Sequence, residues 1–450
     1  MKKTLFFFAL LLAGSVFVTA NAADLIEVYQ QAMTSDPTYQ QSIAQTLATE
    51  EDVPINRAAL LPNAGLAITP SVLKSMSSGP ASYLGSYTQR GYQVQLTLTQ
   101  TIFNFAQFAA LSGAHATAKQ ADATLNAAVQ SLIVRVAEAY FQVLQDEDNL
   151  ASVRSTKAAY TKQLDQVTEQ YKVGLKTITD VYTAEASFES SSANEIAAIN
   201  QIAMDRENLR VITGVLYPHL SKLSENFPMI SPNPSDIDAW VSTAKQQNWS
   251  IKAAQFAAEA ARQNIKQQFA GNLPSLNVQG AYNIIYTRTS GGDPTLGNVG
   301  SSQTHSPSAS LNLTVPLFEG GQVLAETNQA KYQYQAAEQQ LEQTLRNTMN
   351  QARQSYLGIM AGISKIEADK KAIKSARSSY KGLEAGYHVG TQTLVNVLTQ
   401  QQEVLQAELR YAMDRYAYVN HFLALKQAAG TLSPDDLAGI NAWLLKEDNV

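Results

Sequence analysis

The sequence contains no cysteine, and this absence excludes several kinds of chemistry. Disulfides, thiolate catalysis and a lipid anchor attached through cysteine are all ruled out. No metal site or cofactor is expected either, because the five histidines lie far apart without ligand spacing: His115, His219, His305, His388 and His421. Hydrolase, nucleotide-binding and metalloprotease fingerprints are also missing, so nothing indicates an enzyme.

Charge, glycine and proline are scarce as well. Charged residues make up 16% of the chain, and the formal net charge is −5. No basic tract occurs, so nucleic acid is not an expected partner. Long stretches consist mainly of Ala, Gln, Ser, Thr and Asn, which is unusual for compact domains.

Long apolar runs are missing too, except at the start. Lys2 and Lys3 precede an apolar run over 5–18, and Ala20-Asn21-Ala22 supplies the small residues of a cleavage site. Residues 1–22 are therefore expected to be a signal peptide cleaved before Ala23. No later apolar segment reaches the length of a membrane helix, so a membrane-embedded mature chain would have to be a β-barrel.

The remaining chain consists of two similar halves, an internal sequence repeat. A shift of about 216 residues superimposes landmarks throughout: Tyr140 on Tyr356, Tyr171-Lys172-Val173-Gly174 on Tyr387-His388-Val389-Gly390, Val181 on Val397, and Gly214 on Gly430. A period of this length indicates a duplicated domain-sized unit. We expect a first repeat over 23–226, a linker over 227–235, a second repeat over 236–432 and an equatorial tail over 433–450.

Each repeat has the same order of expected elements: a helix of about thirty residues, two strands, a very long helix and a return helix. The helices are expected over 24–58, 105–172 and 178–213, and again over 236–270, 320–387 and 393–429.

The strands alternate between apolar and uncharged polar residues. Tyr92, Val94, Leu96, Leu98 and Ile102 share one face of the clearest strand, and Gln and Thr line the other. The pattern fits a barrel with lipid outside and water inside. An ordinary sheet packed on a core would show the same period. Uncharged polar faces, strands of about ten residues and the export signal favour the barrel.

Four strands per chain are too few for a membrane barrel, which needs about eight. Three chains would supply twelve, so a homotrimer is expected. Residues 75–88 and 288–307, rich in Gly, Ser and Pro, are interpreted as loops at the hairpin tips. Both tips must point outward, which places every helix on the periplasmic side.

The long helices show seams with steps of three and four. One seam runs through Leu150, Val153, Lys157, Tyr160, Leu164, Val167 and Tyr171. Such seams pair helices into coiled coils. A helix over 105–172 would be about 100 Å long, which suits a hollow cylinder better than a globular core.

These features together resemble the TolC-type outer-membrane efflux proteins, whose Y-x-V-G-x-x-T turn occurs at 171–177 and 387–393. The resemblance implies an α+β membrane protein. It would be a trimer with a 12-stranded β-barrel, a 12-helix α-barrel in the periplasm and a mixed equatorial region. It also implies an exit duct in the outer membrane for small molecules or unfolded protein. Its partners would be a periplasmic adaptor (membrane fusion protein) and an inner-membrane transporter.

The resemblance further implies a gate at the periplasmic helix tips. The matching residues are Thr179 and Asp180 in the first half and Tyr387 in the second, with a bond expected between Tyr387 and Asp180. Gln163 and Glu384 fall where the family has a further polar link.

The gate also departs from the family pattern. Gln392 stands where the family has a gating arginine, and Asn396 and Thr399 replace ring-forming acids. Lys176, the repeat-mate of Gln392, is a candidate for the missing charge. Without the acids, the block by polyvalent cations that is typical of the family is not assured.

A secreted trimeric coiled coil with a structural or adhesive role is the alternative. It would explain the helical seams. It would not explain four amphipathic strands placed symmetrically in a duplicated frame. Ion conduction separates the two hypotheses.

Overall fold

The computed structural model describes residues 22–76, 86–225, 227–291 and 300–445. The expected signal peptide therefore lies, apart from Ala22, outside the described residues. The chain forms two compact units: 1–40, 129–243 and 351–450 make up the first, and 41–128 and 244–350 make up the second.

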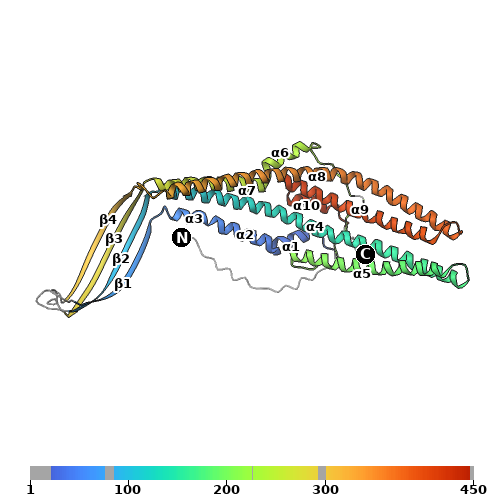
Figure 1. Ribbon diagram of the computed structural model, residues 1–450, viewed down its shortest axis with the longest axis horizontal. Helices are drawn as coiled ribbons and strands as arrows, with labels where there is room; N and C mark the ends of the chain where they lie inside the picture. Colours follow the sequence, from blue (N-terminus) through green and yellow to red (C-terminus); the bar gives the residue numbers. More distant parts are fainter. Residues whose placement is uncertain (1–21, 77–85, 226, 292–299, 446–450) are drawn as a thin grey trace. The chain divides into compact units, whose positions relative to one another are not determined.

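The second unit contains a four-stranded antiparallel sheet in the order β1-β2-β3-β4 (Figure 1). The strands are β1 (Asn63–Ser75), β2 (Tyr87–Phe103), β3 (Ser275–Gly291) and β4 (Gly300–Thr314). Leu66 pairs with Leu96, and Leu96 pairs with Tyr282. Because paired residues share a face of the sheet, the register confirms that the apolar positions of all four strands gather on one side.

The strands are longer than expected. We interpreted 288–307 as a loop, but β3 continues to Gly291 and β4 begins at Gly300. Backbone pairing does not require apolar side chains, and here it is supported by polar contacts such as Thr287 Oγ1 to Ser302 Oγ at 2.9 Å. Pro307 lies opposite Tyr282 in the register of β3 and β4. Of the expected loop over 75–88, residues 77–85 lie outside the described residues.

A register shift corrects one face assignment. Thr101 pairs with Asn277, and Phe103 pairs with Leu276, so Ile102 is the extra residue of a bulge. Phe103, rather than Ile102, therefore continues the apolar face beside Leu276.

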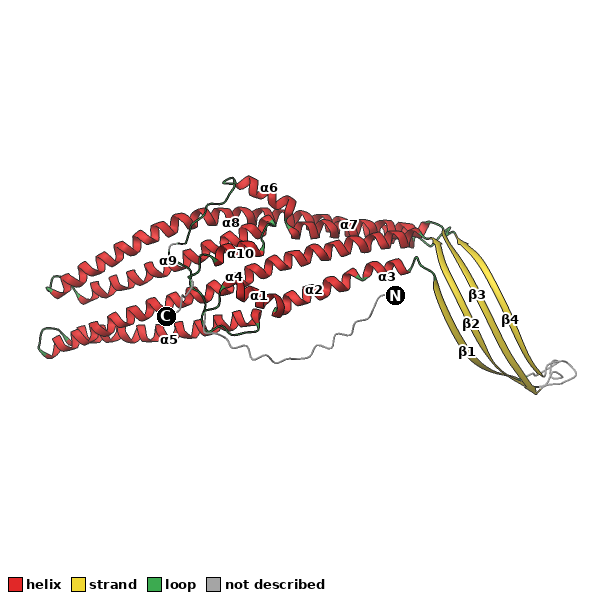
Figure 2. Ribbon diagram, turned by 180° about the vertical axis from the view of Figure 1, so that it is seen from behind, coloured by secondary structure: helices red, strands yellow, loops and turns green. Residues whose placement is uncertain are grey.

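The long helices agree with the periodicity (Figure 2). They are α4 (Phe105–Lys172), α5 (Ile178–Thr213), α8 (Gln322–His388) and α9 (Leu394–Ala429). Seam residues Val153, Tyr160 and Val167 are buried, as the heptad pattern predicts.

A segment of α4 is long and apolar enough to cross a membrane by composition alone, contrary to our interpretation of the sequence. More than half of this segment is buried inside the protein. Core helices pass the same test, so the segment is weak evidence for a transmembrane helix.

The first helix of each repeat is broken, contrary to expectation. In the first repeat α1 (Leu25–Ser35), α2 (Pro37–Glu50) and α3 (Asp52–Ala58) replace the single helix over 24–58. Asp36 precedes Pro37 and is extended, because proline disfavours the helical conformation in the residue before it.

The second repeat breaks at the corresponding point. There α6 (Ile237–Gln247), α7 (Trp249–Phe269) and a 3-10 turn (Ala270–Asn272) replace the helix expected over 236–270. Asn248 caps α7 by accepting a hydrogen bond from Ile251 N at 3.1 Å.

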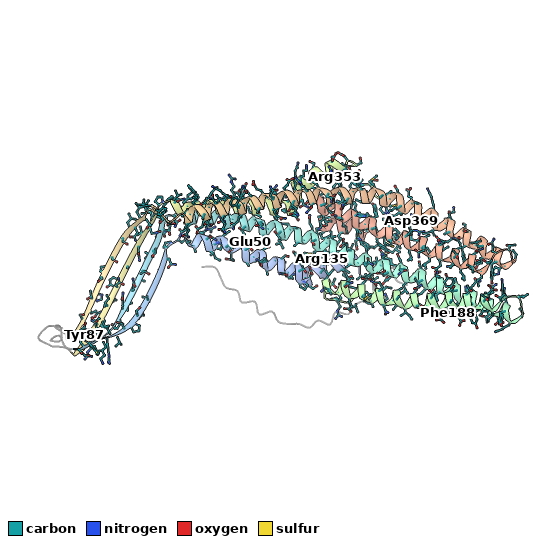
Figure 3. All side chains as sticks on the ribbon, in the orientation of Figure 1. Glu50, Tyr87, Arg135, Phe188, Arg353 and Asp369 are labelled. Carbon is teal, nitrogen blue, oxygen red and sulfur yellow. The ribbon has the colours of Figure 1, made fainter. Side chains whose placement is uncertain are left out.

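Both ends of the described chain are bound into the core of the first unit. The Tyr140 hydroxyl donates to Ala23 O at 3.1 Å or Ser221 O at 2.8 Å. Arg135, labelled in Figure 3, forms an ion pair with Asp36 at the break between α1 and α2. Near the other end, Leu25 N donates to the side chain of Asn441 in α10 (Pro434–Asn441) at 2.9 Å.

Candidate functional site

The two helix-to-helix turns of the first unit have matching local structure. Gly174 and Gly390 adopt φ values of 75° and 82°, which favour glycine and allow each long helix to end. Thr177 and Thr393 then cap α5 and α9. The two Y-x-V-G-x-x-T motifs therefore build the same turn twice.

Asp180 belongs to the first of these turns. Its carboxylate accepts hydrogen bonds from Thr177 N at 3.1 Å and from Thr177 Oγ1 at 2.9 Å. Asp180 N donates in return to Thr177 Oγ1 at 3.2 Å, which completes a capping box. The carboxylate expected at the gate thus stabilises the beginning of α5.

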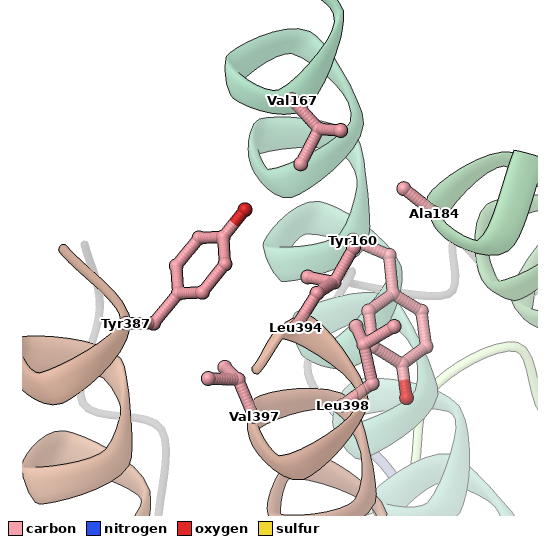
Figure 4. Close-up of a cluster of buried hydrophobic side chains, with 7 residues drawn as sticks. All are labelled: Tyr160, Val167, Ala184, Tyr387, Leu394, Val397 and Leu398. Carbon is pink, nitrogen blue, oxygen red and sulfur yellow. The ribbon is translucent and has the colours of Figure 1, made fainter. Parts of the chain in front are cut away.

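Tyr387 lies instead in an apolar cluster that joins two helical hairpins, one formed by α4 and α5 and the other by α8 and α9 (Figure 4). The buried members of this cluster are Tyr160, Val167, Ala184, Tyr387, Leu394, Val397 and Leu398. Tyr387 is only 4% exposed, and its buried hydroxyl has no hydrogen-bond partner. The expected bond between Tyr387 and Asp180 is therefore not formed in this structure.

Lys176 is the residue of the first turn that contacts Tyr387. Its Nζ lies 4.1 Å from the centroid of the Tyr387 ring, which is a close cation–π contact. The lysine thus extends from the first turn to a residue of the second hairpin. Whether it replaces the gating arginine of the family stays a prediction.

Two hydrogen bonds also link the hairpins near this cluster. Gln166 Nε2 and His388 Nδ1 are 3.1 Å apart, and Gln402 Nε2 donates to the Tyr160 hydroxyl at 2.6 Å. The sequence pattern placed Tyr160 in the seam of α4, but it did not indicate either of these two pairs. Their types are common on polar helix faces, and only the pairing of the hairpins brings them together.

The expected link between Gln163 and Glu384 is not made. The amide nitrogen of Gln163 is buried without a partner. Glu384 instead accepts a hydrogen bond from the Tyr380 hydroxyl at 3.1 Å. Burial, together with the nearby Glu384 carboxylate, raises the pKa of Tyr380 to about 12.

The other predicted gate residues lie at the beginning of α9 and along a groove beside it. Asn396, in the first turn of α9, donates through its side chain to Oε1 of Gln392, which precedes the helix, at 3.0 Å. Thr179 and Thr399 both line a groove of ≈ 610 Å³ between α5 and α9. Polar hydroxyls and the apolar side chains of Val395 and Leu398 share its wall.

A charged layer lies farther along the hairpins. Glu195 accepts from Lys157 Nζ and from Arg154 Nε, each at 2.9 Å, and these bonds lower the pKa of its carboxyl group. On the other hairpin Arg377 pairs with Glu408 at 2.7 Å. Ion pairs of this kind mainly fix the register of partly exposed helices.

A carboxyl pair joins α4 to α5 in the same unit. Burial raises the pKa of Asp146 to about 6, and its hydrogen bond with Asp205 contributes. Gln142 Nε2 donates to Asp146 at 2.9 Å, and Gln201 Nε2 donates to Asp205 at 2.8 Å. Asp146 therefore retains its proton at mildly acidic pH.

Known proteins resemble this chain over nearly its whole length. Residues 28–215 and 240–431 match the family described as "Outer membrane efflux protein". The chain belongs to this family. It is 36% identical to the outer membrane protein TolC of Vibrio cholerae over 444 residues, covering 99% of both chains. It is also 36% identical to TolC of Escherichia coli, covering 95% of this chain and 86% of that one.

More distant relatives share the fold. The alkaline protease secretion protein AprF of Pseudomonas aeruginosa is 28% identical, with 96% of this chain and 88% of AprF covered. The crystal structure of the Campylobacter jejuni CmeC outer membrane channel matches with a TM-score of 0.77 at 18% identity, covering 93% of this chain and 89% of that one. The outer membrane protein VceC from Vibrio cholerae matches with a TM-score of 0.74 at 20% identity, covering 90% and 96%.

Membership of the outer membrane efflux protein family settles the class and location of the chain. It is an outer-membrane channel of the efflux and type I secretion class, and the relatives are channel proteins rather than enzymes. Its sheet contributes four strands to the trimeric 12-stranded barrel, and its long helices contribute to the α-barrel.

Proposed function

We propose that this channel receives its cargo from an inner-membrane transporter through a periplasmic adaptor and releases it outside the cell. The names of the relatives suggest two kinds of cargo, secreted protein and small molecules. AprF is named for alkaline protease secretion, and BepC of Brucella suis is named as an efflux protein. The observation that carries the proposal is the continuity of α4 with a barrel strand, since α4 begins two residues after β2 ends.

The surface of the two turns supports an adaptor as partner. Val173, Leu175 and Val389 are 70%, 72% and 76% exposed. Exposed apolar side chains on an otherwise polar tip are typical of a protein-binding surface.

We expect a photo-crosslinking residue at Val389 to capture a periplasmic protein in cells. The control is the same photo-crosslinking residue placed at Leu324 on α8, which is 66% exposed but lies outside the two turns.

The helix tips form the gate in our proposal. The apolar cluster around Tyr387 holds the two hairpins of one protomer together, and Lys176, Gln166 and Gln402 add polar contacts. Opening would separate the hairpins and break these contacts. Asp180 acts indirectly, because it holds the turn that carries Lys176.

Single-channel current in a planar lipid bilayer tests the function directly. The purified trimer should give a small, long-lived conductance, because the tips are held closed in every protomer. Complete silence across many insertions of a trimeric preparation would contradict the proposed function.

A further inference from the structure

The four strands carry few charged side chains, and all of these are positive. They are Lys74 in β1, Arg90 in β2 and Arg288 in β3. No aspartate or glutamate occurs within the bounds of any of the four strands. A sheet otherwise built from uncharged residues therefore presents an isolated cationic cluster.

The strand register places this cluster on one face. Arg90 pairs with Arg288 on one side and with Val72 on the other, and Lys74 lies two residues beyond Val72. Side chains two residues apart on a strand share a face. The same face continues through Tyr92 and Leu96, so the three cations extend the apolar, lipid-facing surface of the barrel.

The cluster lies at the hairpin end of the strands, away from the helices. Arg90 is three residues from Tyr87, the first residue of β2, which is labelled in Figure 3. Leu98 lies eight residues farther along, about 27 Å at ~3.4 Å per residue. With the usual tilt of barrel strands, this interval becomes about 20 Å, which is close to the height of an apolar membrane band.

A pair of aromatic rings marks the upper limit of that band. Tyr92 and Tyr286 pair directly across β2 and β3, with ring centroids 5.3 Å apart and planes at 24°. Aromatic side chains of membrane barrels gather at the level of the lipid headgroups. The next outward position on each strand is Arg90 or Arg288, so both guanidinium groups lie where headgroups begin.

The protein itself provides no counter-charge among the described residues. All three cations are exposed, and none forms an ion pair with a carboxylate in the part of the chain that the structure describes. Closure of the barrel adds none, because β1 then meets β4 of a neighbouring subunit and β4 contains no acid. Like charges directly opposite each other are destabilising, so an external anion would stabilise this arrangement.

We infer that Arg90 and Arg288, assisted by Lys74, bind the phosphate groups of an anionic glycolipid in the outer leaflet. Arginine presents a planar set of donors that suits phosphate, and two adjacent arginines match a phosphorylated sugar headgroup. The acyl chains would then lie along the apolar face below, past Tyr92 and Leu96. A trimer would hold three such lipids.

Native mass spectrometry of the detergent-purified trimer tests this site. The probes are bisphosphorylated lipid A, the same lipid without its phosphates, and inorganic phosphate. We expect the trimer to retain the bisphosphorylated lipid at least about tenfold more strongly than the dephosphorylated form. The double variant Arg90→Gln/Arg288→Gln should lose this preference, whereas Arg90→Lys/Arg288→Lys should keep part of it.

A matched variant controls for the loss of two charges. Lys331→Gln/Arg346→Gln removes two exposed cations from α8 and should bind the lipid as the wild type does. Unchanged lipid retention in the Arg90/Arg288 variant would overturn the inference. So would inorganic phosphate displacing the lipid at equal concentration, since the site would then recognise a free anion. Single-channel conductance should remain normal in all variants, which distinguishes this site from the channel function.

Discussion

The Tyr387 side chain shows how a single residue can differ from its family-based expectation. Its ring is packed in an apolar cluster and faces Lys176, but its hydroxyl has no partner. An unpaired buried hydroxyl costs roughly 1–3 kcal/mol. The ring, rather than the hydroxyl, therefore carries the contact between the tips in this conformation.

Lys176→Gln should weaken the closed state. A partly exposed cation–π contact is worth about 0.5–1 kcal/mol, so the open-to-closed ratio per protomer should rise about 2–5-fold. Tyr387→Leu should act similarly. Tyr387→Phe should not raise the conductance, because it retains the ring and removes only the unpaired hydroxyl. A rise would instead indicate that the hydroxyl bonds to Asp180 in the closed channel. Lys172→Gln, which removes an exposed lysine paired with Glu169, is the control for bilayer recordings.

Asp146 should make stability depend on pH. Its pKa is raised from 3.8 to about 6, so the folded state binds more protons than the unfolded state between these values. The contribution of Asp146 to the free energy of unfolding is then fully present below about pH 4 and is lost as the pH rises through about 6. Asp146→Asn should flatten this fall and raise stability at neutral pH by on the order of 1 kcal/mol, after allowance for solvent screening.

Thermal dissociation of the trimer between pH 4 and 8 measures this effect. Asp122→Asn, at an exposed position on the same helix, should leave the pH profile unchanged. If Asp146→Asn retained the full pH slope, the protonation of Asp146 would not be its source.

At the scale of elements, glycine sets how closely α8 and α9 pack. A Cβ on Gly358 would lie 2.8 Å from the His421 ring, whereas a Cβ on Gly382 would meet nothing within 4 Å. Gly386 also permits a close approach at the tip, because a Cβ added there would lie 2.8 Å from Gln392 Cγ. Gly390 forms the turn itself. Of these glycines, only Gly382 has no such role.

Gly358→Ala should therefore destabilise the helix pair by about 1–3 kcal/mol, because the His421 ring must move. Gly382→Ala should be neutral or stabilise by up to about 1 kcal/mol, since alanine is the better helix former. Chemical denaturation of the two variants in parallel compares them. Equal effects would mean that α8 and α9 adjust freely at Gly358.

At the scale of the whole molecule, the symmetry of the trimer multiplies any charge at the tips. One Asn396 per chain becomes three around the axis, and an acid at this position would form a ring. Asn396→Asp should create or sharpen block of the current by polyvalent cations, because three nearby carboxylates attract them strongly. Strong block in the unmodified protein would show that another acid, such as Asp180, already forms the ring.

The sequence alone was sufficient for whatever depends on local periodicity. The ends of α4 and α5, the shared apolar face of Leu66, Leu96 and Tyr282, and the two capped turns all follow from spacing and turn residues. The duplicated frame and the strand count led to the trimeric barrel, because a membrane sheet cannot leave its edges unpaired.

Only the tertiary structure decided which polar side chains meet. Asp180 can cap its own helix or reach Tyr387. It forms the local capping box, because the donors, Thr177 N and Thr177 Oγ1, belong to a residue only three positions earlier in the chain. Lys176 meets the Tyr387 ring, and Gln166 meets His388, across more than 200 residues of sequence. Such pairs have no local signature. They depend on how two coiled coils pack, and that packing is a property of the assembled hairpins.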